Sequence, residues 1–510
     1  MAGPASVSSH SATRSSKPVP TLFNRPDADA ILYSSDKTHF RVHRQILSVA
    51  SPFFETMFSL PQSTPSSVGN LPVVPMEEDA RTVEDLLRIC YPGRDPQLKT
   101  CTASEWQHIG GMVRAAQKYD LAAAVEFMEA TLTANADSFP LIVYCIACTH
   151  DMEVIAKHAA RSLLACVKDG HGLNMERWSA LETLYVPQLE DISAGCYHRL
   201  MQAIRGGKLP DGSRVRLHGA TKETNTNSRR TSVCTLDRCP DNGPTEFTLR
   251  AADGIDYKVS KKTFLSFRPH AADTSTTLSL SIRSSVLQLL LPLLDASTTT
   301  EELHDCKSVA PALRAAAKYK MDKLHAALKK RWLELFAGDP LRSYLIASVY
   351  GLEDEAVGSA KLLLFRTMLE LRALYVPIME SVSAGSYFRL LRYHKKCADA
   401  ADGVRKAWLK AFPQGLKVPQ TCPQRRCSRE YSKRSRWMDI CFTRLYAMRD
   451  CPRQDVAEDR ALLGELCFQA GNCASCAERV SNTNVMKFLA AYSKANKEAI
   501  SKVGTSMLFK

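Results

Sequence analysis

The chain of 510 residues has no long apolar run. Its longest apolar stretch, Leu287–Leu294, is interrupted by Pro292, whereas a membrane-spanning helix needs about 20 apolar residues. The N-terminus has no apolar segment typical of a secretion signal, and prolines at positions 4, 18, 20 and 26 oppose the helix of a transit peptide. We therefore expect no membrane insertion, a disordered tail over residues 1–25, and a cytoplasmic or nuclear location.

The sequence also lacks the short motifs that mark common catalytic sites. It contains no G-x-x-x-x-G-K-S/T loop, no G-x-S-x-G turn, no H-E-x-x-H and no Rossmann glycine string. We therefore expect that the protein is not an enzyme. Hydrophobic residues make up 45% of the chain and charged residues 24%, which is ordinary for folded domains.

Cysteine and positive charge are plentiful but unevenly distributed. The 17 cysteines are an odd number in a chain without a secretion signal, which favours reduced thiols over disulfides. Seven of them lie between Cys422 and Cys476. The net charge is +14, and residues 389–436 hold 14 Lys/Arg against 3 Asp/Glu. The C-terminal region is therefore distinct in composition from the rest of the chain.

An internal repeat organises most of the remaining sequence. Residues 184–200 read LYVPQLEDISAGCYHRL and residues 374–390 read LYVPIMESVSAGSYFRL, with eleven of 17 positions identical. Other segments match in the same order: VRAAQKYDL at 113–121 with LRAAAKYKM at 313–321, and FRVHRQIL at 40–47 with YKVSKKTF at 257–264. The chain therefore uses one folding unit twice, and the Gly-, Pro-, Ser- and Thr-rich residues between the copies form a linker.

Each copy is predicted to begin with strands and to continue as helices, which is an α+β pattern. In the first copy, residues 30–34 and 38–42 indicate a β-hairpin. Two short helices follow at 43–50 and 52–58, the second capped by Ser51. Later elements are a strand at 71–76 and helices at 103–118, 121–134, 138–149, 152–167, 175–185 and 193–205. The second copy keeps a hairpin at 247–250 and 256–259, but FRPHAADTSTTL replaces SVASPFFETMF, so its short helices are poorly kept.

Three segments of the first copy carry a family resemblance. ADAIL at 28–32, FRVHRQIL at 40–47 and SPFFETMF at 51–58 are similar to the pattern of the BTB/POZ domain family. The whole chain resembles the double BTB proteins common in fungi, with a degenerate second copy. The resemblance implies two BTB/POZ-like units, each with a helical extension, and a mostly helical, cysteine-rich C-terminal region. The expected divisions are 1–25 (tail), 26–135 (BTB/POZ-like), 136–206 (extension), 207–243 (linker), 244–325 (degenerate BTB-like), 326–395 (extension) and 396–510 (C-terminal region).

The resemblance also implies interaction residues. Asp29, His43 and Arg44 match the charged groove positions of the family. For Asp29, the structural alternative is a satisfied hydrogen bond. Because Phe53 and Phe54 are adjacent and cannot share one helical face, we expect Phe54 to be exposed at the partner surface. The core should then contain Phe40, Phe53 and Phe58.

Two cysteine groups suggest chemistry of their own. Cys145-x-x-Cys148-x-His150 resembles a metal or redox string, but it lies in a helical pattern, and the other copy lacks the same groups, so we expect buried helix cysteines. At the C-terminus, two short-spaced pairs could hold a structural zinc ion; buried thiols and a disulfide are the alternatives. The candidate metal ligands are Cys422, Cys427, Cys473 and Cys476.

These observations predict a protein–protein interaction module, a homo-oligomerising adaptor or scaffold that could recruit substrates to a cullin-type ubiquitin ligase. The alternative is a nuclear transcription regulator with a zinc-binding, nucleic-acid-associated C-terminal region. The basic segment around RRCSREYSKRSRW at 425–437 carries Tyr431 and Trp437 among its charges. Phosphate contacts and aromatic stacking would suit nucleic acid, but a solvated surface or a nuclear import signal explains the segment as well. Protein partners are therefore preferred.

Overall fold

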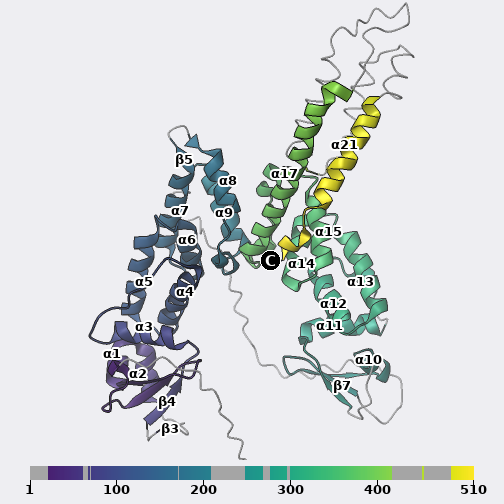
Figure 1. Ribbon diagram of the computed structural model, residues 1–510. Helices are drawn as coiled ribbons and strands as arrows, with labels where there is room; N and C mark the ends of the chain where they lie inside the picture. The colour runs from purple at the N-terminus through teal and green to yellow at the C-terminus, as the bar shows by residue number, and fades with distance from the viewer. Residues whose placement is uncertain are drawn as a thin grey trace, which may run out of the picture. The chain divides into compact units, whose positions relative to one another are not determined.

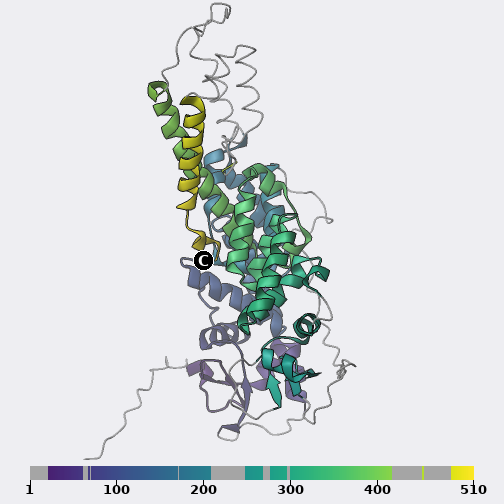
Figure 2. The same ribbon diagram turned by 90° about the vertical axis from the view of Figure 1, so that its right-hand side faces the viewer.

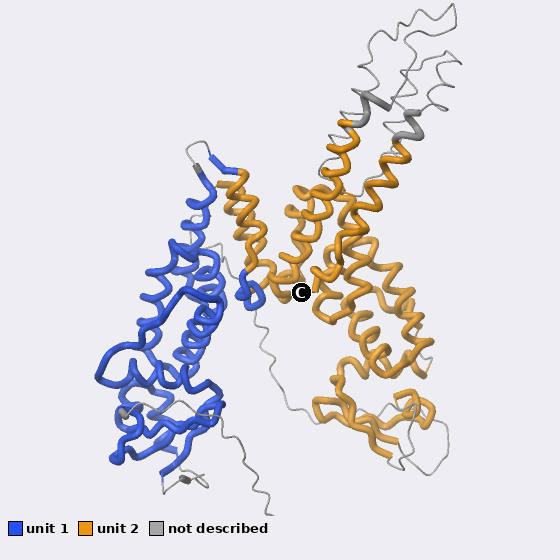
Figure 3. Tube along the Cα trace, in the orientation of Figure 1, with its two compact units in different colours: residues 1–174, 186–191 blue, residues 175–185, 192–510 orange. Residues whose placement is uncertain are grey.

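The computed structural model describes residues 21–60, 67–68, 71–169, 172–207, 247–267, 276–295, 299–415, 451–452 and 484–509 (Figure 1). The chain divides into two compact units (Figure 3). Unit 1 contains residues 1–174 and 186–191, and unit 2 contains residues 175–185 and 192–510. Residues 192–207, from the end of the first copy, therefore belong with the second copy.

The described part of unit 1 begins with the 3-10 helix η1 (Thr21–Phe23), whose Phe23 is fully buried, so our prediction of a disordered tail over 1–25 was wrong for residues 21–25. A small mixed sheet follows. The strands β1 (Ala30–Tyr33) and β2 (His39–Val42) form the predicted hairpin, with Leu32 paired to Phe40. A further strand, β4 (Leu71–Pro75), lies parallel to β1, and β3 (Ser67–Val68) extends the sheet in the order β2-β1-β4-β3. In β2 the alternation buries Phe40 and Val42, as a period of two requires, whereas β1 is buried at three consecutive residues, Ala30, Ile31 and Leu32.

Helices make up most of the rest of unit 1, and most begin where the sequence predicts. The two short helices are α1 (Arg44–Ala50) and α2 (Pro52–Ser59), and Ser51 Oγ accepts the Phe54 N–H at the start of α2. This confirms Ser51 as the helix cap with proline in the first turn. The longer helices are α3 (Ala80–Cys90), α4 (Ala103–Lys118), α5 (Ala122–Asn135), α6 (Pro140–Thr149) and α7 (Glu153–Val167). Cys145 and Cys148 are buried in α6, as expected.

The second copy repeats the strand topology of the first. In unit 2, β7 (Phe247–Arg250) pairs antiparallel with β8 (Asp256–Val259) and parallel with β9 (Thr277–Ser279), as β1 does with β2 and β4. Tyr257 pairs with Leu249, as Phe40 pairs with Leu32. One short helix, α10 (Lys261–Ser266), follows the hairpin. Residues 268–275, which correspond to most of α2, lie outside the described residues.

The helices of the second copy follow in the same order. They are α11 (Ser284–Leu294), α12 (Cys306–Lys318), α13 (Asp322–Leu335), α14 (Pro340–Tyr350), α15 (Glu353–Leu363) and α16 (Met368–Ala373). Left-handed backbone recurs at matching positions, with φ of 49° at Asp120 and 56° at Lys320, both just before the next helix. The repeat thus extends to backbone conformation.

Corresponding residues of the two copies lie 200 positions apart at 113–121 and 313–321, but 190 positions apart at 184–200 and 374–390. An insertion in the first copy accounts for the difference. Between α7 and α8 (Met175–Thr183), the first copy has a small hairpin of β5 (Lys168–Asp169) and β6 (Gly172–Leu173). Beyond it, each copy has a short 3-10 helix, η2 (Pro187–Glu190) or η4 (Pro377–Glu380). Each then continues as a longer helix, α9 (Ala194–Arg205) or α17 (Ala384–Gly415). The two most similar segments of the sequence therefore adopt the same structure.

The C-terminal region begins inside a helix. The boundary that we expected at residues 395–396 lies within α17, which continues without interruption to Gly415. The later helix α21 (Asn484–Ser501) lies beside α17 in both views (Figure 1; Figure 2), with the rings of Trp408 and Tyr492 6.0 Å apart. The four candidate metal ligands, at 422, 427, 473 and 476, lie outside the described residues. Among the described residues, no group of three or more His, Cys, Asp or Glu could hold a metal ion.

Candidate interaction surface

An open groove lies on unit 1 between three helices of the first copy. Its volume is about 650 Å³. Side chains from α1, from the end of α3 and from the start of α5 line it, and most of them are apolar: His43, Gln45, Ile46, Val49, Ala50, Ile89, Cys90, Leu121, Ala123 and Ala124. Val49 is 85% exposed at the edge of the groove. A concave apolar surface with few polar groups is typical of a binding site.

Hydrogen bonds to the start of α1 hold one wall of this groove. The His43 side chain, at the N-cap position, does not cap the helix. Instead, Asp29 Oδ1 accepts the Arg44 backbone N–H at 2.7 Å, and the His43 backbone N–H donates to Tyr91 Oη at 2.7 Å. A carboxylate at a helix N-terminus also complements the helix dipole. Asp29 and Tyr91 therefore fix α1 against the sheet and against the end of α3.

The sequence-predicted residues have different environments in the structure. His43 lines the groove, and its Nε2 lies 3.5 Å from Asp27 Oδ1. Arg44 lies instead over the ring of Phe58, with 5.4 Å from Cζ to the ring centroid, which is a cation–π contact. Asp29 is exposed and caps α1. The role of these three residues in partner binding stays a prediction.

Our prediction for the paired phenylalanines was wrong. Phe54 is buried, with 2% of its surface exposed, whereas Phe53 is 42% exposed. The reason is the cap of α2: Ser51 Oγ accepts the Phe54 N–H at 3.1 Å and donates to the Tyr119 carbonyl at 2.5 Å. This link turns the Phe54 ring onto Tyr119, with 5.6 Å between centroids. Phe40 is buried as expected, and Phe58 is half-buried.

The thiol in the groove behaves as an apolar group. Burial raises the pKa of Cys90 to about 11, so the thiol stays protonated near neutral pH. Burial likewise raises the pKa of Tyr91, against the effect of the hydrogen bond from the His43 backbone. The side chains that line the groove thus include no carboxylate, lysine or arginine.

The corresponding positions of the second copy are more polar. Val49 corresponds to Ser266, and Gln45 corresponds to Lys262, by the alignment of the paired hairpins. In α5 and its counterpart α13, Ala123 corresponds to Lys323. Sequence reasoning missed Val49 and Ala123 because each is unremarkable alone. The signal that could have found them is this difference between two otherwise matching segments.

Comparison with known proteins agrees with the geometry of the first copy. The family model of the BTB/POZ domain matches residues 22–136. This range contains every residue that lines the groove. No curated protein matches the chain. The BTB/POZ domain is a protein-interaction domain and not an enzymatic one, so residues 22–136 form a protein–protein interaction module. In the part of the chain that the structure describes, no helix has the length and apolar character needed to cross a membrane.

Proposed function

We propose that the protein is a non-enzymatic, homo-oligomerising adaptor or scaffold that binds protein partners through the groove of its first copy. The observation that carries this proposal is the apolar groove of about 650 Å³ on the matched domain, with Val49 exposed at its edge. Large exposed apolar side chains grouped at a concave surface are characteristic of protein interfaces. Phe53 of α2, which is 42% exposed, is a further exposed apolar side chain of the same domain.

The second copy would be a degenerate BTB-like unit that does not bind partners through a groove of its own. Its strands have the topology of the first sheet, which supports a common origin of the two folds. Lys262 and Lys323 replace Gln45 and Ala123 at the positions that line the groove in the first copy. A lysine at such a position disfavours burial against an apolar partner. The second copy would then contribute to a scaffold, while the first copy binds.

A pair of matched substitutions tests the groove. Val49→Asp should reduce oligomerisation of the full chain at least about tenfold, because the partner would have to bury a carboxylate. Ser266→Asp, at the corresponding position of the second copy, should leave it unchanged. Light scattering coupled to size-exclusion chromatography over micromolar concentrations measures both. A wild-type chain that stays monomeric throughout, or a Val49→Asp chain with unaltered mass, would refute oligomerisation through this groove.

Recruitment to a cullin-type ubiquitin ligase is the more specific form of the proposal. It predicts direct binding of a purified cullin N-terminal domain to the full chain, measured by calorimetry. The absence of binding at 50-fold excess over about 1 μM would remove the ligase role and leave the scaffold. The alternative function, a zinc-containing nuclear regulator, depends on residues outside the described ranges and stays a prediction.

A further inference from the structure

The two copies of the repeat contact each other through corresponding residues within unit 2. Ser193 forms an isolated antiparallel bridge with Ser383, the residue 190 positions later. The Ala194 N–H donates to the Val382 carbonyl at 2.7 Å, and the Ala384 N–H donates to the Ile192 carbonyl at 2.8 Å. Exchanging each residue with its repeat counterpart converts the first hydrogen bond into the second. A local two-fold axis therefore passes between Ser193 and Ser383.

Aromatic side chains around this axis follow the same symmetry. Tyr197 lies against its own counterpart, Tyr387, with 6.4 Å between ring centroids. Tyr185 lies 5.6 Å from Phe388, and the symmetry-related contact is the 5.8 Å between Tyr375 and His198. The helices α8 and α9 form one side of this pairing, which we call the first extension surface. The helix α16 and residues 384–395 of α17 form the other, the second extension surface.

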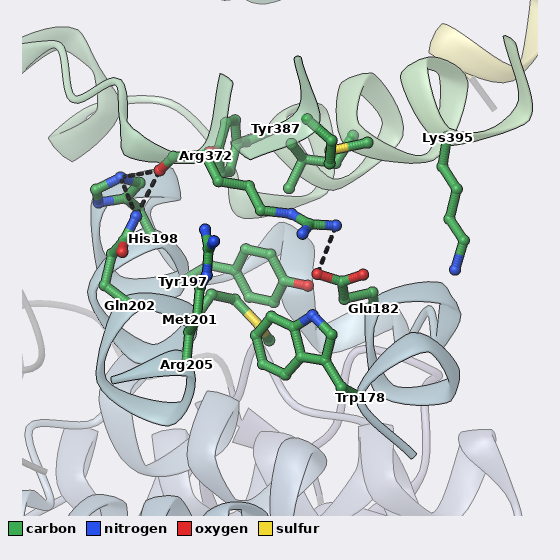
Figure 4. A pocket seen from close by; sticks show the side chains of 12 residues that line it. Trp178, Glu182, Tyr197, His198, Met201, Gln202, Arg205, Arg372, Tyr387 and Lys395 are labelled. Carbon is green, nitrogen blue, oxygen red and sulfur yellow. Dashed lines mark hydrogen bonds and ion pairs between the residues drawn. The ribbon is translucent and has the colours of Figure 1, made fainter. Parts of the chain in front are cut away.

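One pair of counterparts on the axis breaks the symmetry in charge. Glu182 and Arg372 are repeat counterparts, and they face each other in an ion pair, with 2.6 Å between Arg372 Nη2 and Glu182 Oε1 (Figure 4). Their side chains are 14% and 20% exposed, respectively. The guanidinium of Arg372 also lies over Trp178, 6.0 Å from the ring centroid. A position that contacts its own counterpart thus carries opposite charges in the two copies.

Little water is available to solvate these two charges. The pocket around them encloses about 20 Å³, enough for about one water molecule. Burial raises the pKa of Glu182 despite Arg372, and burial lowers the pKa of Arg372 despite Glu182. Desolvation thus acts against both charges, and each charge depends on the other for compensation.

We propose that the Glu182–Arg372 pair makes the first extension surface heterotypic: its partner is the second extension surface of the same chain, and pairing of either surface with its own copy on a second chain is excluded. A surface that pairs with itself across two chains would place Glu182 against Glu182, or Arg372 against Arg372. Like charges in a desolvated contact strongly oppose association. The Glu182–Arg372 pair therefore selects the mixed pairing and excludes the two self-pairings.

The mixed pairing is tested on the full chain with a protease site inserted between residues 215 and 235 and cleaved after folding. The two pieces of the wild-type protein should co-elute, because α8 and α9 remain bound to α16 and α17. Glu182→Arg and Arg372→Glu should each weaken the association at least about tenfold, and the double exchange should restore it to within about threefold. Arg342→Glu, which reverses a more exposed ion pair of unit 2 with Asp305, is the control and should change nothing.

The exclusion of self-pairing is tested separately in a Val49→Asp background, so that association through the groove of the first copy does not contribute. Glu182→Gln with Arg372→Gln removes the repulsion while leaving the mixed pairing possible. After cleavage between residues 215 and 235, this double variant should redistribute in part into pairs of like pieces by light scattering, whereas the charged parent should stay as the mixed pair. Equal masses for variant and parent would overturn the exclusion, and separation of the cleaved wild-type pieces or failure of the double exchange would overturn the mixed pairing.

Discussion

At the scale of single residues, Phe53 and Phe54 show how one hydrogen bond sets the environment of two identical side chains. Ser51 caps α2 and also donates to the Tyr119 carbonyl, so the helix has a fixed rotation about its axis. Phe54 then stacks on Tyr119, and Phe53 retains 42% exposure. The sequence could predict that the two rings point in different directions, but not which one points inward, because the deciding contact joins residues 68 positions apart.

The two phenylalanines should respond differently to truncation. Phe54→Ala should lower the free energy of unfolding by about 3–5 kcal/mol, as expected when a buried aromatic ring leaves a cavity. Phe53→Ala should lower it by about 1 kcal/mol, because much of that ring is already in water. Denaturant titration of the full chain, followed by circular dichroism, measures both. Equal losses for the two variants would contradict the assigned environments.

At the scale of elements, the helix bounds were predictable because their signals are local. Ser51 and Ser193 cap the helices that follow them, and the apolar spacing located the long helices. The strand pairing of the second copy followed from its hairpin pattern. The groove was not predictable, because α1, α3 and α5 contribute to it from distant parts of the sequence.

His198 should make the extension pairing sensitive to acid. Its Nε2 lies 2.9 Å from the Arg372 carbonyl, and burial lowers its pKa from 6.5, with Arg199 acting in the same direction and Glu380 opposing it. Because the folded pKa is lower than the unfolded one, the unfolded chain binds more protons as the pH falls below about 6.5, and stability decreases. The effect is absent well above that pH.

The repeat offers its own control for this acid effect. The counterpart of His198 is Phe388, so His198→Phe introduces a side chain that the other copy already accommodates at the related position. The variant should lose less stability than the wild type between pH 7 and pH 5. Thermal unfolding across that range gives the comparison. A decline as steep in the variant as in the wild type would assign the acid sensitivity to other groups.

At the scale of the whole molecule, the sequence predicted that a unit is used twice but not how the copies are joined. Similarity between residues 184–200 and 374–390 shows that they fold alike. It does not show that they touch, and the contact between Ser193 and Ser383 became visible only in the structure. For the same reason, the assignment of α8 and α9 to unit 2 could not be predicted from the order of the chain.

The C-terminal cysteines call for a metal measurement on the intact protein. A zinc site at the four candidate positions predicts about one zinc ion per chain by mass spectrometry of the purified protein. Cys473→Ser should lose that zinc, whereas Cys451→Ser, whose thiol contacts the Phe365 carbonyl at 3.6 Å, should keep it. A wild-type chain purified without chelators and free of zinc would leave reduced thiols as the explanation of the cysteine content.

The bridge between Ser193 and Ser383 joins two parts of a single polypeptide, which has a consequence for cells that make little or much of this protein. A contact within one molecule does not dissociate on dilution, so its occupancy is the same at any expression level. Association through the groove beside Val49 would instead obey mass action and fade as copies become scarce. The protein would then combine a contact between extension surfaces that does not depend on its concentration with a groove contact that forms only when its concentration is high enough.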